Sequence, residues 1–350
     1  MSRLSPRFAI LLAATTALVP ATALADDNPW IQRDAQSFAV RSLSMDGVVG
    51  VTTVAVNPAA TGVTVRVEGK QQVISLVVVR QDGDSVVIEM EGHTGSDWID
   101  EWLDWSFEGD HAEIKDLKIQ IEVPEGAPVA FESYIGDLEV GSTNGPLTLE
   151  GLGSIDAVIG NVSSAEIEVA GGGEIQILSV SGALSAGIAG SGDIIVGNTQ
   201  SASISVAGSG DVALGNVNGS LAVEIAGSGE CIVDNLSGAI DVSIAGSGDV
   251  RIRNGRAEPV EVAIAGSGTF HFNGEAVNPS ISVVGSGDVW FASYSGQLSS
   301  DGGDIRIGGS PDGDLSAPAR APRAPSVPSA PPLPVPPVAP VAPPPPATPG

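Results

Sequence analysis

The sequence predicts an all-β protein, a parallel β-helix-like solenoid, on two observations. A glycine-serine-glycine-acid motif recurs between residues 171 and 288, and apolar residues alternate with small or polar ones on both sides of each copy. The fourth position of the motif falls at residues 174, 193, 211, 230, 249, 269 and 288, so the spacing is 18 to 20 residues. A two-residue period indicates strands. Two strands in about 19 residues fit one rung of a solenoid, whereas a propeller blade needs about 40 to 45 residues.

The first strand of each rung is expected to point two apolar columns inward. One column is Ile188, Val206, Ile225, Ile244, Ile264 and Val283, and the other is Ile204, Val223, Val242, Val262 and Ile281. The residues between them, Ser205, Glu224, Ser243 and Ser282, are small or polar and should face water. The second strand should bury Val196, Leu214, Val233, Ile252, Phe272 and Phe291. Cys231, the one cysteine, shares a column with Val212 and Val250, so we expect a small buried hydrophobe.

Glycine is expected to form the corner between the two strands, because it adopts positive φ without steric cost. The predicted turn residues are Gly190, Gly192, Gly208, Gly210, Gly227, Gly229, Gly246, Gly248, Gly266, Gly268, Gly285 and Gly287. Asparagines at 161, 198, 216, 235 and 254 mark a second corner, and asparagine tolerates the left-handed region.

The chain is strongly acidic, with a formal net charge of −27. From Ile119 to Val250 there are 17 Asp and Glu residues and no Lys or Arg, which argues against nucleic acid as a partner. The recurring acids Asp193, Asp211, Asp249 and Asp288 are weak candidate ligands for calcium. We expect turn N–H groups to satisfy them instead, and therefore expect no cofactor; a calcium-dependent binding module stays open as an alternative.

The ends of the chain differ from the repeats. Residues 1–25 read as a signal peptide with a cleavage site at Ala23-Leu24-Ala25, and no later stretch is apolar enough for a transmembrane segment. Residues 26–123 read as a β-rich lead-in that caps the solenoid of residues 124–315, with strands at 63–69, 73–79 and 86–90. Residues 316–350 contain 15 prolines and read as a disordered tail, or as a spacer or docking arm.

An acidic insert in the lead-in contains Trp98, Trp102 and Trp105, whose spacing places them on one helical face. Such a helix would cover the end of the solenoid, or would contact a partner, since tryptophan is frequent at binding hot spots.

No catalytic or metal-binding motif is recognisable in the sequence. The three histidines lack metal-ligand spacing, and the glycine turns lack the helix and lysine of a phosphate-binding loop. β-Helices can nevertheless host polysaccharide-active enzymes, and the basic corner formed by Arg251, Arg253 and Arg256 is where such chemistry would be sought.

Four features resemble a known family: the segment Phe38–Val56, the VTVRVEG strand at Val63–Gly69, the VPEGAP segment at Val123–Pro128 and the serial AGSGD turns. Together they are similar to the putative autotransporter adhesin head GIN domain family. The resemblance implies a β-helix-like fold, no established catalysis and an adhesin-like role. We therefore expect a non-enzymatic scaffold or binding module in the periplasm or on the surface of a Gram-negative-type bacterium, with an envelope protein or a glycan as partner.

Overall fold

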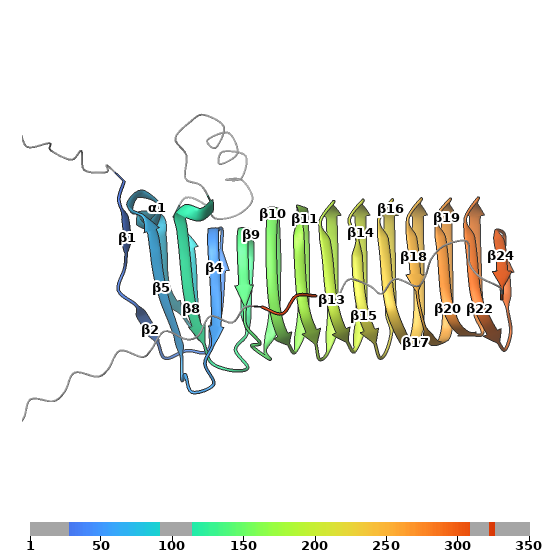
Figure 1. The fold of residues 1–350 in the computed structure, drawn as a ribbon, viewed down its shortest axis with the longest axis horizontal. Helices are drawn as coiled ribbons and strands as arrows, with labels where there is room; N and C mark the ends of the chain where they lie inside the picture. Colours follow the sequence, from blue (N-terminus) through green and yellow to red (C-terminus); the bar gives the residue numbers. More distant parts are fainter. Residues whose placement is uncertain (1–27, 92–113, 309–321, 326–350) are drawn as a thin grey trace, which may run out of the picture.

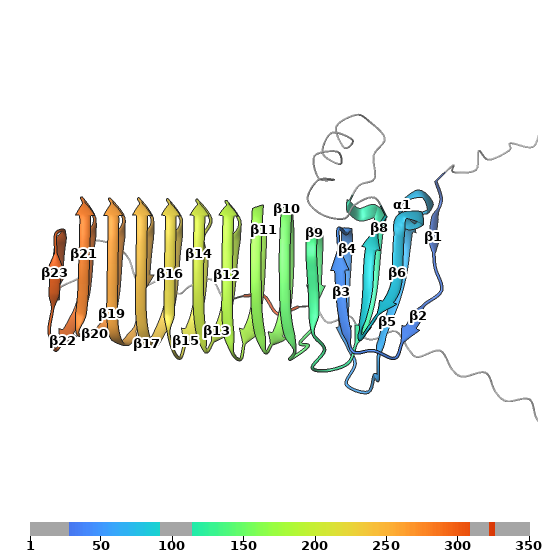
Figure 2. The same cartoon turned by 180° about the vertical axis from the view of Figure 1, so that it is seen from behind.

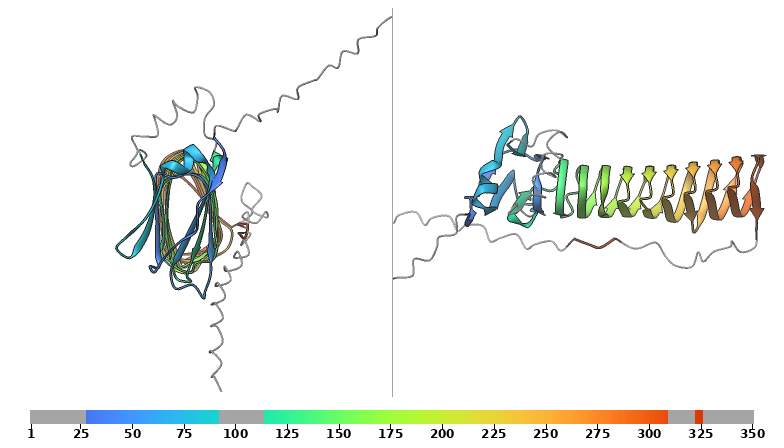
Figure 3. Two further views of the ribbon diagram at one scale, coloured as in Figure 1. Left: turned by 90° about the vertical axis from the view of Figure 1, so that its left-hand side faces the viewer. Right: turned by 90° about the horizontal axis from the view of Figure 1, so that it is seen from above.

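The protein is an elongated rod built from stacked β-strands (Figure 1). The structure is a computed structural model that describes residues 28–91, 114–308 and 322–325. Viewed along its length, the rod is a flattened tube with one sheet on each broad side (Figure 3). The predicted signal peptide, the tryptophans at 98, 102 and 105, and most of the proline-rich tail lie outside the described residues.

Each rung contributes one strand to each of two sheets, and successive rungs pair in parallel. We name the sheets after their outward residues: the alanine sheet faces the viewer in Figure 2 and the acid sheet in Figure 1. Strands within the alanine sheet are β12 (Ala183–Gly190), β14 (Ser201–Gly208), β16 (Leu221–Gly227), β21 (Pro279–Gly285) and β23 (Ser299–Asp301). Those within the acid sheet are β13 (Asp193–Thr199), β15 (Val212–Val217), β18 (Asp249–Ile252), β20 (Thr269–Val277), β22 (Asp288–Ser295) and β24 (Asp304–Ile307).

Five longer strands continue around a corner and so take part in more than one stretch of pairing. They are β9 (Val129–Val140), β10 (Pro146–Val162), β11 (Ser164–Val180), β17 (Glu230–Gly246) and β19 (Gly255–Gly266). In β17, for example, Glu230 pairs with Asp249 in the acid sheet and Gly246 pairs with Gly266 in the alanine sheet. Such long strands let the repeat pass from one sheet to the other without a loop.

The register confirms the solenoid with rungs of about 19 residues. Ile188 pairs with Val206, which in turn pairs with Ile225, so each inward column of the sequence forms a continuous stack. All predicted members of the three inward columns are buried, and Ser205, Glu224, Ser243 and Ser282 are exposed. Cys231 is fully buried between Val212 and Val250. Each parallel sheet has one face in solvent. Its other face packs against the opposite sheet, and the two sheets share one apolar core.

The first rung is formed out of sequence order. β3 (Ser42–Asp46) and β4 (Val49–Val56) pair in parallel with the two halves of β9, although more than 70 residues separate them in the chain. On the far side of this rung, β3 pairs with β7 (Ser85–Met90), and β4 pairs with β8 (Leu117–Val123). Residues 42–56 therefore extend the solenoid beyond β9, where the sequence alone suggested a lead-in.

At this end the sheets become antiparallel. β5 (Val63–Lys70) pairs antiparallel with β8, and its other edge pairs with β1 (Trp30–Gln32) and β2 (Gln36–Phe38). On the other side, β6 (Val77–Asp82) pairs antiparallel with β7. A short 3-10 helix, η1 (Ile114–Asp116), precedes β8.

The apolar run at 73–79, expected as a strand, begins as a helix instead. α1 (Gln71–Leu76) connects β5 in one sheet to β6 in the other, and it buries Val73 and Ile74. A short apolar run cannot be assigned to helix or strand by periodicity alone. The guanidinium of Arg33 donates to the carbonyls of Ile74 at 2.6 Å and Val77 at 2.7 Å. The Ile74 carbonyl also accepts the N–H of Val77, so Arg33 adds a second hydrogen bond at the end of the helix.

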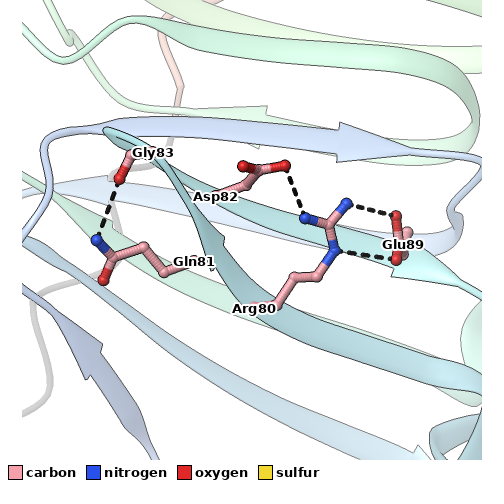
Figure 4. A network of polar contacts seen from close by, with 5 residues as sticks. All are labelled: Arg80, Gln81, Asp82, Gly83 and Glu89. Atoms are coloured by element: carbon pink, nitrogen blue, oxygen red, sulfur yellow. Dashed lines mark hydrogen bonds and ion pairs between the residues drawn. The ribbon is translucent and has the colours of Figure 1, made fainter.

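The edge of the alanine sheet at this end is charged. Arg80 on β6 donates to Glu89 through Nε at 3.2 Å and Nη2 at 3.3 Å, and to Asp82 through Nη1 at 2.9 Å (Figure 4). Gln81 Nε2 donates to the carbonyl of Gly83 at 3.1 Å and so stabilises the turn between β6 and β7. Charged side chains on an edge strand discourage pairing with a further chain.

Candidate binding surface

The glycine turns combine two different steric requirements. The first glycine of each GSG has φ between +126° and +143°, a region that L side chains rarely adopt; these glycines are Gly190, Gly208, Gly227, Gly246, Gly266 and Gly285. The second glycine is limited by space instead. A Cβ at Gly229 would lie 2.4 Å from the carbonyl oxygen of Gly210 and 2.9 Å from Val206 Cγ1. The turns therefore set the rung geometry and leave no room for a bound group inside the corner.

The residue after each turn forms an acid ladder along the acid sheet. The register places Asp137, Asp156, Glu174 and Asp193 in line, and Glu230, Asp249, Thr269, Asp288 and Asp304 continue the same line. Asp211 takes its place between Asp193 and Glu230, because Val212 pairs with both Ile194 and Cys231. Only Thr269 interrupts the carboxylates. Neighbouring rungs in a sheet lie about 4.8 Å apart, so the ladder is a dense row of negative charge.

Hydrogen bonds between successive rungs offset part of this repulsion. The amide N–H of Glu174 donates to Asp156 Oδ1 at 3.1 Å, that of Asp211 to Asp193 Oδ1 at 3.2 Å, and that of Glu230 to Asp211 Oδ1 at 2.9 Å. Further along, the Thr269 hydroxyl donates to Asp249 Oδ1 at 2.5 Å. Each of these carboxylates thus accepts a hydrogen bond from the next rung. Partial burial raises the pKa of Asp211 above its ordinary value, because the charged form loses solvent there.

Arginines neutralise the ladder near its middle. Arg251 forms ion pairs with Glu230 and, at 3.0 Å, with Asp249; Arg253 pairs with Asp234 at 2.7 Å. Arg256, at the adjoining corner, pairs with Glu275 and with Glu258 at 3.5 Å. The basic corner singled out from the sequence is therefore a set of ion pairs.

The column beside the ladder is apolar from Val158 to Ile232 except at Gln176. The outward residues Val158, Gln176, Ile195, Ala213 and Ile232 follow one another in register, and we call this column the outer stripe. Arg251, His271 and Trp290 continue the column. Burial of His271 lowers the pKa of its imidazole, and the charge of Arg251 adds to this effect.

A hollow of about 460 Å³ lies where the ladder and the outer stripe meet the first rungs. Its lining includes four carboxylates, Asp137, Glu139, Asp156 and Glu174, together with the Gln176 side chain. Arg323 from the proline-rich tail also lines it, and the Arg323 amide N–H donates to Gln176 Oε1 at 2.6 Å. The segment Pro322–Pro325 is drawn in red beside the rod in Figure 3.

The sequence predicted the ladder residues and the turn glycines but not this contact with the tail. Asp193, Asp211, Asp249 and Asp288 do lie in one row, and no group of three or more His, Cys, Asp or Glu side chains within the described ranges is arranged to bind a metal ion. A usable signal for the contact was present: arginines in an otherwise uncharged tail, in a chain whose residues 119–250 lack any base. Among the described residues, no helix is long and apolar enough to cross a bilayer.

Solved structures similar to the chain include a putative adhesin from Parabacteroides distasonis, 17% identical, covering 80% of this chain and 98% of that one, with a TM-score of 0.37. A putative adhesin from Bacteroides fragilis is 16% identical, covers 80% and 97%, and has a TM-score of 0.40. A putative lipid binding protein from P. distasonis is 16% identical, covers 78% and 96%, and has a TM-score of 0.36.

No curated protein matches the chain. The family model described as putative auto-transporter adhesin, head GIN domain, matches residues 48–235 and 216–294. These ranges include the out-of-order β4, every glycine turn and most of the acid ladder. The chain belongs to this family of head GIN domain proteins.

Proposed function

We propose that this protein is an exported, non-enzymatic binding module of the bacterial envelope whose binding surface is the acid sheet. The observation that supports the proposal most directly is the acid ladder, which continues in register from Asp137 to Asp304. A stiff row of regularly spaced carboxylates matches a partner that presents several cations, such as a basic region of an envelope protein or an amine-bearing glycan. Family membership supports a role in adhesion.

The ion pairs of the basic corner favour binding over catalysis. An oxyanion-stabilising arginine has to be available to the reacting group. Arg251 and Arg253 are each engaged by carboxylates of the ladder or of its neighbouring corner. The cations near the ladder therefore serve to reduce its self-repulsion.

A pair of charge-matched variants tests the surface. In one variant Asp193, Asp211 and Asp288 are changed to Asn, which removes three ladder charges; in the control Glu224→Gln, Asp241→Asn and Glu261→Gln remove three charges from the exposed face of the alanine sheet. Binding of each purified mature chain to isolated envelopes of the producing bacterium is measured at low and high salt. We expect the ladder variant to bind more weakly and with a smaller salt dependence, and the control to bind like the wild type. Equal loss in both variants would contradict a specific role of the acid sheet.

Export is tested separately on cells. Protease treatment of intact and permeabilised cells distinguishes surface display from the periplasm. Mass spectrometry of the mature N-terminus tests cleavage of the signal peptide. A chain that retains residues 1–25 would contradict export by cleavage after Ala25.

A further inference from the structure

Residues of the tail cover the outer stripe at one place. Along this column Val158, Ala213 and Ile232 are partly exposed, whereas Gln176 is 8% and Ile195 5% exposed. All five side chains lie on the outward face of the same sheet, so their position in the sheet does not explain the difference in exposure. Gln176 accepts the amide N–H of Arg323, and a Cβ added at Gly197, two residues after Ile195, would lie 3.4 Å from Pro322 Cγ. The two buried positions are those that adjoin the tail segment.

The polar part of this contact is specific. Gln176 Nε2 donates to the carboxylate of Glu174, which directs Oε1 of the same amide toward the tail. Proline has no N–H, so in Pro322–Pro325 the available backbone donors are those of Arg323 and Ala324. Of these two donors, the Arg323 N–H is the one that Gln176 binds. An extended proline-rich segment binds with little loss of conformational entropy, because its backbone is already restricted.

Charge complementarity favours the same occupant. Arg323 shares its hollow with Asp137, Glu139, Asp156 and Glu174. These four carboxylates come from residues 119–250, a part of the sequence that contains no lysine or arginine. The tail therefore places a cation beside this group of carboxylates. Because Arg323 remains largely exposed, its attraction to them is screened and the contact is reversible.

From these contacts we propose that the hollow and the adjoining outer stripe form a docking groove for an extended Pro-Arg-Ala-Pro segment, and that the protein's own Pro322–Pro325 occupies it in cis. The tail is then a built-in competitor, and an external ligand of the same chemistry enters the groove only when the tail leaves. This proposal deepens the binding role proposed above by naming the ligand chemistry of one part of the acid sheet.

The test uses full-length mature chains and a fluorescein-labelled peptide with the sequence of residues 317–326. The wild type is compared with Arg323→Glu, which repels the tail from the groove without altering the solenoid. A tethered segment has an effective concentration of roughly millimolar, so its removal should tighten binding of the added peptide by about tenfold if the segment's own dissociation constant is near 0.1 mM. Fluorescence anisotropy measures both affinities.

Groove variants are then made in the Arg323→Glu background. Ile195→Asp places a charge on the covered part of the outer stripe and should abolish peptide binding. Ile232→Asp makes the same change in the same column two rungs further on, where the stripe is partly exposed, and should leave binding intact. Circular dichroism confirms that both variants are folded.

Three results would overturn the proposal: no peptide binding to the Arg323→Glu chain, equal affinity for that chain and the wild type, or equal effects of the two aspartates. The envelope-binding experiment can fail independently, because it removes ladder charges at Asp193, Asp211 and Asp288, none of which lines the hollow. A working groove without envelope binding would leave the tail contact in place and reject the adhesion role.

Discussion

The amide N–H of Glu230 donates a 2.9 Å hydrogen bond to Oδ1 of Asp211, one rung earlier. This contact joins consecutive members of the acid ladder through the backbone of one and the side chain of the other. It shows how like charges are accommodated in a parallel stack: Asp211 is also an acceptor for the next rung, as are Asp156, Asp193 and Asp249.

Replacing Asp211 distinguishes its charge from its hydrogen bond. Asp211→Asn retains an oxygen acceptor for the Glu230 amide and removes the charge, so we expect a melting temperature equal to or above that of the wild type at pH 7. Asp211→Ala removes both and leaves the amide without this partner, so we expect a loss of about 0.5–1.5 kcal/mol. Thermal denaturation followed by circular dichroism measures both variants; an Asn variant as unstable as the Ala variant would contradict the hydrogen-bond argument.

The raised pKa of Asp211 also predicts a pH dependence. Its folded-state pKa lies above the ordinary value of 3.8, so the folded state binds the proton more tightly than the unfolded state. The resulting stabilisation is fully present below pH 3.8 and is lost as the pH rises through the folded-state pKa. Asp211→Asn should therefore gain most over the wild type near neutral pH, and its advantage should shrink on acidification. An advantage that grows as the pH falls would reverse the sign of this argument.

Removal of divalent cations tests the alternative that calcium stabilises the ladder. Because Asp156, Asp193 and Asp211 already accept amide N–H groups, we expect a chelator to lower the melting temperature by less than about 2 °C, which corresponds to about 0.5–1 kcal/mol for a domain of this size. The measurement is a thermal melt with chelator, with chelator and excess calcium, and with neither. A large loss that calcium restores, and magnesium does not, would favour a calcium-dependent module.

The sequence predicted the repeated part of the fold well, because each rung repeats the same local solution. Inward columns such as Ile188, Val206 and Ile225 follow from alternation alone, and the spacing of the turns then aligns them between rungs. The acid ladder follows from the same register. These features depend only on contacts between neighbouring copies of one motif.

What the sequence did not predict depends on contacts between unlike segments. β3 and β4 form a rung that stacks on β9, but they carry no glycine turn of the repeated type, and their partner lies far along the chain. α1 connects β5 in one sheet to β6 in the other and buries Val73 and Ile74, and periodicity alone does not distinguish such a short apolar helix from a strand. The contact between Arg323 and Gln176 joins residues 147 positions apart, and a proline-rich segment has no periodicity that would identify its partner.

Two glycines provide a matched test of the turn geometry. Gly227 has φ of +143°, and a Cβ there would lie 2.1 Å from the carbonyl oxygen of Gly208, so Gly227→Ala should destabilise the protein by more than the about 1–3 kcal/mol expected from backbone strain alone. Gly187 lies in β12 with extended backbone, and a Cβ there would have its first neighbours at 3.9 Å. Gly187→Ala should be neutral or stabilise the protein by about 0.4–1 kcal/mol, since it restricts the unfolded chain. Chemical denaturation measures the free energy of unfolding of both variants, and similar changes at the two sites would argue against a strained turn.

The single cysteine reports on the integrity of the stack. Cys231 is fully buried, and burial raises the pKa of its thiol to about 12, so the native protein should not react with a maleimide at pH 7.5 while the denatured protein should react completely. Its neighbours in register are Val212 and Val250. Cys231→Val therefore places the same residue type in the column, and we expect its stability to be close to that of the wild type. Cys231→Ser places a hydroxyl in the same apolar column and should cost about 1–3 kcal/mol. Mass spectrometry of the labelled protein and denaturation of the two variants measure these effects. Rapid labelling of the native chain would show that the rungs separate around residue 231, and this would contradict a continuously packed core.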